Sequence, residues 1–143
     1  GDAQPVTSNW ERNNHANFSK IGTGMTESSG IFTFPETGLW KIIWHVQFYG
    51  GGANAYGRVQ IDWSTNSGVS YVSNGWSDQS GWGTTNSGNN GQYISETSMT
   101  INVTNASTFR CQFEAEQSDN SQNVYGASAD ATWAEFTRLA DDQ

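Results

Sequence analysis

Large apolar residues alternate with other residues along one stretch of the chain, from position 40 to position 49. Successive side chains of a β-strand point to opposite faces of the sheet, so an alternation of period two places every second residue on one face. The pattern therefore predicts a strand with one buried face. The residues expected on that buried face are Trp40, Ile42, Trp44, Val46 and Phe48.

Shorter alternating runs recur at positions 59–63, 99–103 and 109–115, and turn-forming residues follow each of them. No long window keeps the spacing of apolar residues that a helix requires. Short strands separated by turns predict an all-β chain, folded as an antiparallel β-sandwich or jelly roll. In a last run, at 131–140, Trp133 and Phe136 are three positions apart and cannot share a face of a regular strand. This spacing predicts a β-bulge or an end of pairing between them.

The segment GIFTFPETGLW, at positions 30–40, predicts two core strands joined by a corner. Pro35 has no backbone N–H to donate and has a fixed φ, so it should end the pairing of the first strand. Gly38 can adopt the positive φ that such a corner can require. The chain is expected to enter the second strand at Leu39.

Length and composition limit the classes of protein to which the chain can belong. Its 143 residues suit a single domain over 1–143. The net charge is -8 and the six basic residues are scattered, which argues against nucleic acid or an anionic membrane as a partner. No apolar run is long enough to insert across a bilayer. Cys111 is the single cysteine, which excludes an internal disulfide framework and a multi-cysteine metal site.

The corner segment resembles the complement and tumour-necrosis-factor-like globular head family, whose early strands carry the pattern Gly-x-Phe-Thr-x-Pro-x-x-Gly-x-Tyr. Met25 departs from the family because an aromatic residue is usual there, and Glu135 stands where the closing strand usually has glycine. The resemblance implies a jelly roll of about ten strands that forms a homotrimer. The wider segment 18–40 is most similar to such domains on bacteriophage fibres and other virion appendages. The matching positions, with tryptophan in place of the family tyrosine, are Gly30, Phe32, Thr33, Pro35, Gly38 and Trp40.

Candidate catalytic and metal-binding chemistry is sparse. His15 and His45 lie in no recognisable nucleophile or metal-ligand motif, and fourteen acidic residues make chance carboxylate pairs common. The segment SDNSQN around Asp119, with Asp130 nearby, offers oxygen ligands for calcium but lacks the spacing of a calcium loop, and a polar hairpin turn is the favoured interpretation. We therefore predict no catalytic residue, no metal, no cofactor and no enzymatic activity.

The segment at 73–92 is rich in glycine, serine and asparagine and shows no periodicity, which predicts a long loop. Its two tryptophans, Trp76 and Trp82, are candidate ligand-binding residues, with Asp78 between them. Exposed rings flanked by polar side chains can stack on the faces of sugars. The alternative interpretation, in which each ring folds back to cap an end of the sandwich, is equally consistent with the sequence.

The face of the 40–49 strand that should point away from the core also carries apolar residues. Leu39, Ile43 and Tyr49 are expected there, and they predict either a covering layer or an oligomer interface.

The resemblance implies a non-enzymatic viral module, the C-terminal jelly-roll domain of a longer bacteriophage virion protein. Its predicted role is structural and adhesive, as a tail fibre tip or capsid decoration at the virion surface. The expected partners are two further copies of the chain and a host-surface polysaccharide, while a monomeric capsid decoration is also consistent. The alternative is a carbohydrate-binding or lectin-like module of a secreted protein.

Overall fold

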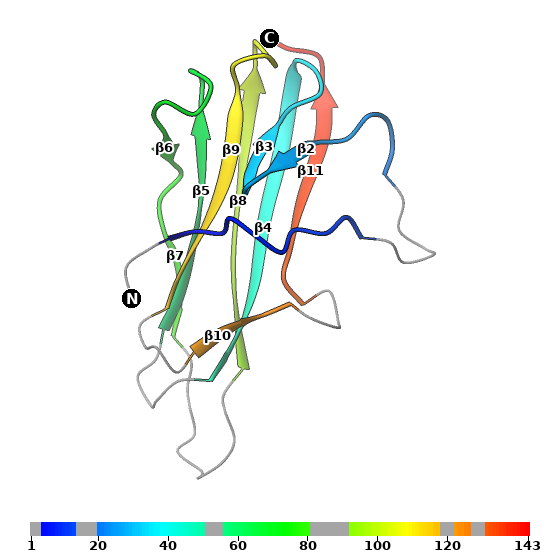
Figure 1. The fold of residues 1–143 in the computed structure, drawn as a ribbon. Helices are drawn as coiled ribbons and strands as arrows, with labels where there is room; N and C mark the ends of the chain where they lie inside the picture. Colours follow the sequence, from blue (N-terminus) through cyan, green and yellow to red (C-terminus); the bar gives the residue numbers. More distant parts are fainter. Residues whose placement is uncertain (1–3, 14–19, 51–55, 81–91, 118–121, 127–130) are drawn as a thin grey trace.

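A computed structural model of the chain describes residues 4–13, 20–50, 56–80, 92–117, 122–126 and 131–143. Within these ranges the chain forms eleven strands in two antiparallel sheets that pack as a sandwich (Figure 1). The all-β prediction, with about ten strands, is confirmed.

The first sheet, here called the β5–β9 sheet, is centred on two long neighbours, β5 (Tyr56–Ser64) and β9 (Arg110–Gln117). Beyond β9 lie β3 (Ile31–Thr33), β2 (Thr26–Ser28) and β1 (Gln4–Pro5). On the other side of β5 lie β6 (Val72–Ser73) and β7 (Ser77–Ser80).

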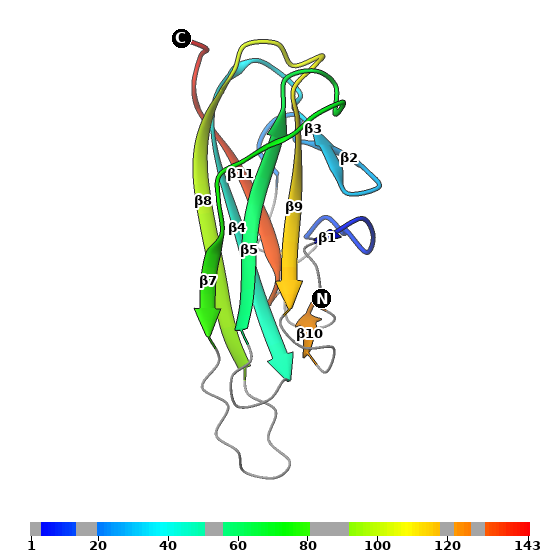
Figure 2. The same cartoon turned by 90° about the vertical axis from the view of Figure 1, so that its left-hand side faces the viewer.

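The second sheet, here called the β4–β8 sheet, is centred on β4 (Gly38–Gly50). β8 (Gln92–Val103) pairs with one edge of β4 along twelve residue pairs. β11 (Trp133–Ala140) and β10 (Gln122–Tyr125) share the other edge of β4. Figure 2 shows the two sheets face to face, with β5 and β9 in front of β4 and β11. The chain crosses between the two sheets at the connections β3–β4, β4–β5, β7–β8, β8–β9 and β9–β10.

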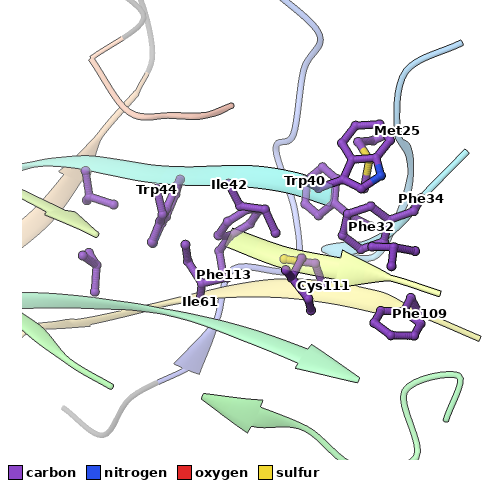
Figure 3. Packing of buried hydrophobic residues seen from close by; sticks show 14 of the residues in the cluster. Met25, Phe32, Phe34, Trp40, Ile42, Trp44, Ile61, Phe109, Cys111 and Phe113 are labelled. Atoms are coloured by element: carbon purple, nitrogen blue, oxygen red, sulfur yellow. The ribbon is translucent and has the colours of Figure 1, made fainter. Parts of the chain in front are cut away.

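The alternation of apolar residues along β4 produces the predicted buried face. All five residues expected there are buried, and three of them have no exposed surface. Aromatic side chains from both sheets meet these residues and fill the space between the sheets (Figure 3). The ring of Phe113, on β9, lies 5.0 Å from that of Trp44 and 5.7 Å from that of Phe136 on β11. Burial of such large rings explains how a chain with 34% hydrophobic residues forms a core.

Residues 4–13 form a segment that lies across one open side of the sandwich (Figure 1). Trp10 inserts between the sheets, with its ring 4.9 Å from Phe32, 5.4 Å from Trp44 and 5.5 Å from Phe113. Its indole nitrogen donates a hydrogen bond to the carbonyl oxygen of Val6, 2.8 Å away. The amino-terminal segment therefore completes the core, although its sequence carries no alternation that predicts such a role.

The predicted corner at 30–40 is confirmed. β3 ends at Thr33 and β4 begins at Gly38, so Pro35 lies in the connection between the sheets. Gly38 has a φ of 143°, and a Cβ atom there would lie 2.6 Å from the carbonyl oxygen of Ala140. Glycine at this position thus permits both the backbone conformation and the close approach of the chain at the end of β11.

Two predictions about strands are wrong. Pairing of β11 with β4 is continuous from Trp133 to Arg138, and the shift in register lies between Arg138 and Ala140 instead of between Trp133 and Phe136. Trp133 simply lies on the outer face, where its ring stacks on His45. The segment at 73–92 is not entirely loop, because residues 77–80 form β7 along the edge of β5. Backbone pairing with an edge strand needs no apolar alternation, which explains why the pattern missed it.

Candidate functional site

A band of hydrogen-bonded polar side chains covers the outer face of β5 and β9. Antiparallel pairing places residues of the two strands opposite one another, and each such pair shares one face of the sheet. The polar band, as we define it, consists of Arg58, Gln60 and Asp62 on β5 and Gln112, Glu114 and Glu116 on β9.

One end of the polar band is an ion pair enclosed by aromatic rings. The guanidinium of Arg58 donates hydrogen bonds of 2.9 and 2.6 Å from Nε and Nη2 to Oε2 of Glu116. The hydroxyl of Tyr56 donates to the other carboxylate oxygen of Glu116 at 3.2 Å. The Arg58 guanidinium lies 4.7 Å from the ring centroid of Trp76, at cation–π distance. The Glu116 side chain is only 8% exposed. The charge-assisted hydrogen bonds from Arg58 stabilise its carboxylate in this buried position.

The middle of the polar band is held by Gln60. Its amide nitrogen donates to Oδ1 of Asp62 at 3.1 Å and to Oε2 of Glu114 at 2.8 Å. Its carbonyl oxygen accepts a hydrogen bond of 3.0 Å from the hydroxyl of Ser73, on β6. Gln112 donates to the second oxygen of Asp62 at 3.0 Å. Both oxygens of the Asp62 carboxylate therefore accept hydrogen bonds from amide side chains.

Burial and neighbouring charge perturb the acids of the polar band. Burial raises the pKa of the Glu114 carboxyl, and the adjacent Asp62 raises it further. Asp62 is only 4% exposed although it lies on an outer face. The segment between β5 and β7 passes over the upper ends of β5 and β9 (Figure 2). Burial raises the pKa of the Tyr71 hydroxyl in this segment, and its oxygen has no hydrogen-bond partner in the described part of the chain.

The outer face of the β4–β8 sheet has a different character. The imidazole of His45 stacks on the ring of Trp133 at 4.8 Å and lies 2.7 Å, through Nδ1, from a carboxylate oxygen of Glu96. Ile43 lies two residues before His45 on β4 and is half-buried. It is paired with Ser98 on β8 and with Glu135 on β11. Exposed large hydrophobic residues on β8 and β11 extend the apolar character of this sheet: Ile94 and Leu139.

The residues that the sequence singled out are distributed between these two surfaces. Trp76 is half-buried and folds onto Arg58 at the edge of the polar band. Asp78 is paired through its backbone with Arg58, as part of β7. Trp82 lies outside the described residues, so the structure does not place the two tryptophans together.

The three predicted interface residues, Leu39, Ile43 and Tyr49, belong to β4 and are half-buried, in alternation with its core residues. The prediction that they point away from the core is confirmed by this alternation. Their role in an interface stays a prediction.

The described residues include neither a metal-binding cluster nor a membrane-spanning helix. Among the described residues, no group of three or more His, Cys, Asp or Glu side chains could hold a metal ion. His15, Asp119 and Asp130 lie outside those residues. Cys111 is fully buried, and burial raises the pKa of its thiol. The described ranges include no helix that could cross a membrane.

Sequence reasoning missed the polar band, although a signal for it was present. The alternation of Val59, Ile61 and Trp63 that predicts the buried face of β5 also places Arg58, Gln60 and Asp62 on its opposite face. What the local pattern lacks is the identity of the neighbouring strand. β9 lies about fifty residues away in sequence, and only its pairing with β5 brings the acids and amides together.

Comparison with protein-family models and with curated proteins finds no match to this chain.

Proposed function

We propose that this chain is a non-enzymatic structural and adhesion module of a bacteriophage virion appendage, at a fibre tip or on the capsid surface. The antiparallel β-sandwich and the Pro35 to Gly38 corner support it, because both are features of the complement and tumour-necrosis-factor-like heads that the sequence resembles. The observation that carries the proposal is the outer face of the β4–β8 sheet, where half-buried Ile43 and exposed Ile94 lie among neighbours that are mostly polar.

In this proposal the outer face of the β4–β8 sheet, centred on its apolar side chains, is the contact between subunits of a homotrimer. Apolar and aromatic residues are enriched at the centres of such interfaces. Leu39, Ile43 and Tyr49 contribute from β4, and Ile94 contributes from β8. Three copies would present three identical binding surfaces, so weak contacts with a host-surface polymer would combine into strong adhesion.

The test is the molar mass of the parent and of two lysine variants, measured by light scattering after gel filtration. The chain has a mass of 15.6 kDa, and the proposal expects the parent at three times this value. Ile43→Lys should give monomers, because it buries a charge in the contact. Val72→Lys, on β6 of the other sheet, should remain trimeric because Val72 is 59% exposed. A monomeric parent would eliminate the trimer and leave only the monomeric capsid decoration.

A second candidate function is a carbohydrate-binding or lectin-like module of a secreted protein. The half-buried ring of Trp76, at the border of the polar band, is the observation that favours it. A monomer that binds polysaccharide through this border, and that does not adhere to bacterial hosts, would favour this candidate over the virion module.

A further inference from the structure

We infer that the polar band on β5 and β9 is a binding surface for an uncharged, hydroxyl-rich polysaccharide, with the ring of Trp76 as its aromatic border. This inference rests on the proposed adhesive function and names the class of polymer that the module would bind. It also moves the centre of the candidate site from the 73–92 segment to the outer face of the sheet.

The polar side chains of the band are already held in fixed positions. Gln60 uses both amide hydrogens and its carbonyl oxygen within the band, so it fixes Asp62 and Glu114 and is itself fixed by Ser73. Asp62 in turn orients Gln112. Side chains that are ordered before binding lose little entropy when a ligand arrives. Gln60 and Asp62 therefore act as positioning residues.

Half-buried polar groups lie outside this buried layer, toward the surface. Gln112 and Glu114 are both partly exposed, whereas Gln60 and Asp62 are buried. Only one amide hydrogen of Gln112 is used within the described part of the chain, which leaves a donor and the carbonyl acceptor for a ligand. The amide of Gln112 can donate to and accept from hydroxyl groups, and the carboxylate of Glu114 can accept from them. They suit a ligand that is rich in hydroxyls.

Charge selects against an acidic polymer. The Arg58 cation is neutralised by two hydrogen bonds to one carboxylate oxygen of Glu116, so its charge is already paired and does not favour an acidic sugar. Asp62 and Glu114 add negative charge at the centre of the band, and the net charge of the chain is -8. An anionic polysaccharide would meet repulsion at this surface, while an uncharged one would not.

The aromatic border and the length of the band suit a short stretch of a sugar chain. Trp76 lies beside Arg58 at one end of the band. From Arg58 to Asp62 the band follows β5 for about 13 Å at the usual strand rise. An aromatic ring that packs on the apolar face of a sugar would add to the hydrogen bonds made along this length.

The test combines affinity electrophoresis with calorimetry. Native gels containing β-glucan, mannan, galactan, xylan or dextran are compared with gels containing alginate or polygalacturonate. The hexasaccharide of any polymer that retards the protein is then titrated calorimetrically, which measures each site separately and is insensitive to trimer avidity. We expect retardation by at least one uncharged polymer and by neither acidic polymer.

Four variants locate the site, and circular dichroism verifies that each is folded. Trp76→Ala should weaken hexasaccharide binding about tenfold and Gln112→Ala about fivefold, consistent with the loss of one ring contact or one hydrogen bond. Trp133→Ala, a matched tryptophan on the other sheet, should bind like the parent. Trp82→Ala tests the original loop hypothesis and should also bind like the parent.

Three results would overturn the inference: no retardation by any uncharged polymer, equal or stronger retardation by an acidic one, or binding that Trp76→Ala and Gln112→Ala leave unchanged. Failure here is distinguishable from failure of the proposed function. If the protein is a trimer that adheres to host cells but binds no uncharged polysaccharide, the proposed function stands and the proposed site is refuted. If it is a monomer that binds polysaccharide through Trp76, the site stands and the trimeric module is refuted.

Discussion

The contribution of the amino-terminal segment to the core can be measured by replacing Trp10 with alanine. Trp10 contacts three aromatic rings, contributed by β3, β4 and β9, and so bridges the two sheets. Truncation of a buried tryptophan costs about 3 to 5 kcal/mol, and the half-burial of Trp10 places the expected loss near the lower limit, at about 3 kcal/mol. For a chain of 143 residues this loss corresponds to a decrease in Tm of about 10 °C.

Trp133→Ala is the matched control for this measurement. Trp133 is also half-buried, but its only ring contact in the described structure is the stack on His45 at an outer face. Its replacement should cost about 1 kcal/mol, the value of one aromatic pair. Urea denaturation followed by far-ultraviolet circular dichroism, at one fixed protein concentration, gives both free energies of unfolding. Equal losses for the two variants, or a loss below about 1 kcal/mol for Trp10→Ala, would refute the assignment of residues 4–13 to the core.

Three further substitutions test the corner and the polar band. Gly38→Ala should lower the free energy of unfolding by about 2 kcal/mol or more, since its Cβ would lie 2.6 Å from the carbonyl oxygen of Ala140, and thermal denaturation with an unchanged Tm would contradict this. Arg58→Met should cost about 3 kcal/mol in urea denaturation because it leaves the Glu116 carboxylate buried without its partner, and the additional change Glu116→Gln should restore most of the loss. Glu114→Gln tests the raised pKa of this carboxyl: the stability that its proton supplies is present below the ordinary value of 4.5 and is lost as the pH rises through the raised pKa. The variant should therefore gain stability relative to the parent above that pKa, and Tm curves that stay parallel from pH 4 to pH 7 would contradict the shift.

Local patterns were sufficient to predict the parts of the fold that depend on neighbouring residues. The alternation from Trp40 to Phe48 predicted the buried face of β4 because side-chain direction in a strand follows from backbone geometry alone. Pro35 and Gly38 predicted the corner for the same reason, since their effects on φ and on hydrogen bonding are properties of the residue itself. The outward direction of Ile43 likewise followed from its position in the alternation.

The tertiary structure decided what depends on strands that are distant in sequence. Pairing of β5 with β9 brings Gln60 to Glu114, and pairing of β7 with β5 brings Trp76 onto Arg58. Trp10 enters the core only because two sheets leave a side open that its ring can fill. The periodicity of the sequence does not predict these contacts. They depend on long-range packing, in which many arrangements of the same strands compete. The sequence by itself determined a sandwich with a β4 core strand and a corner, and the assembled sheets determined where a polar surface could form.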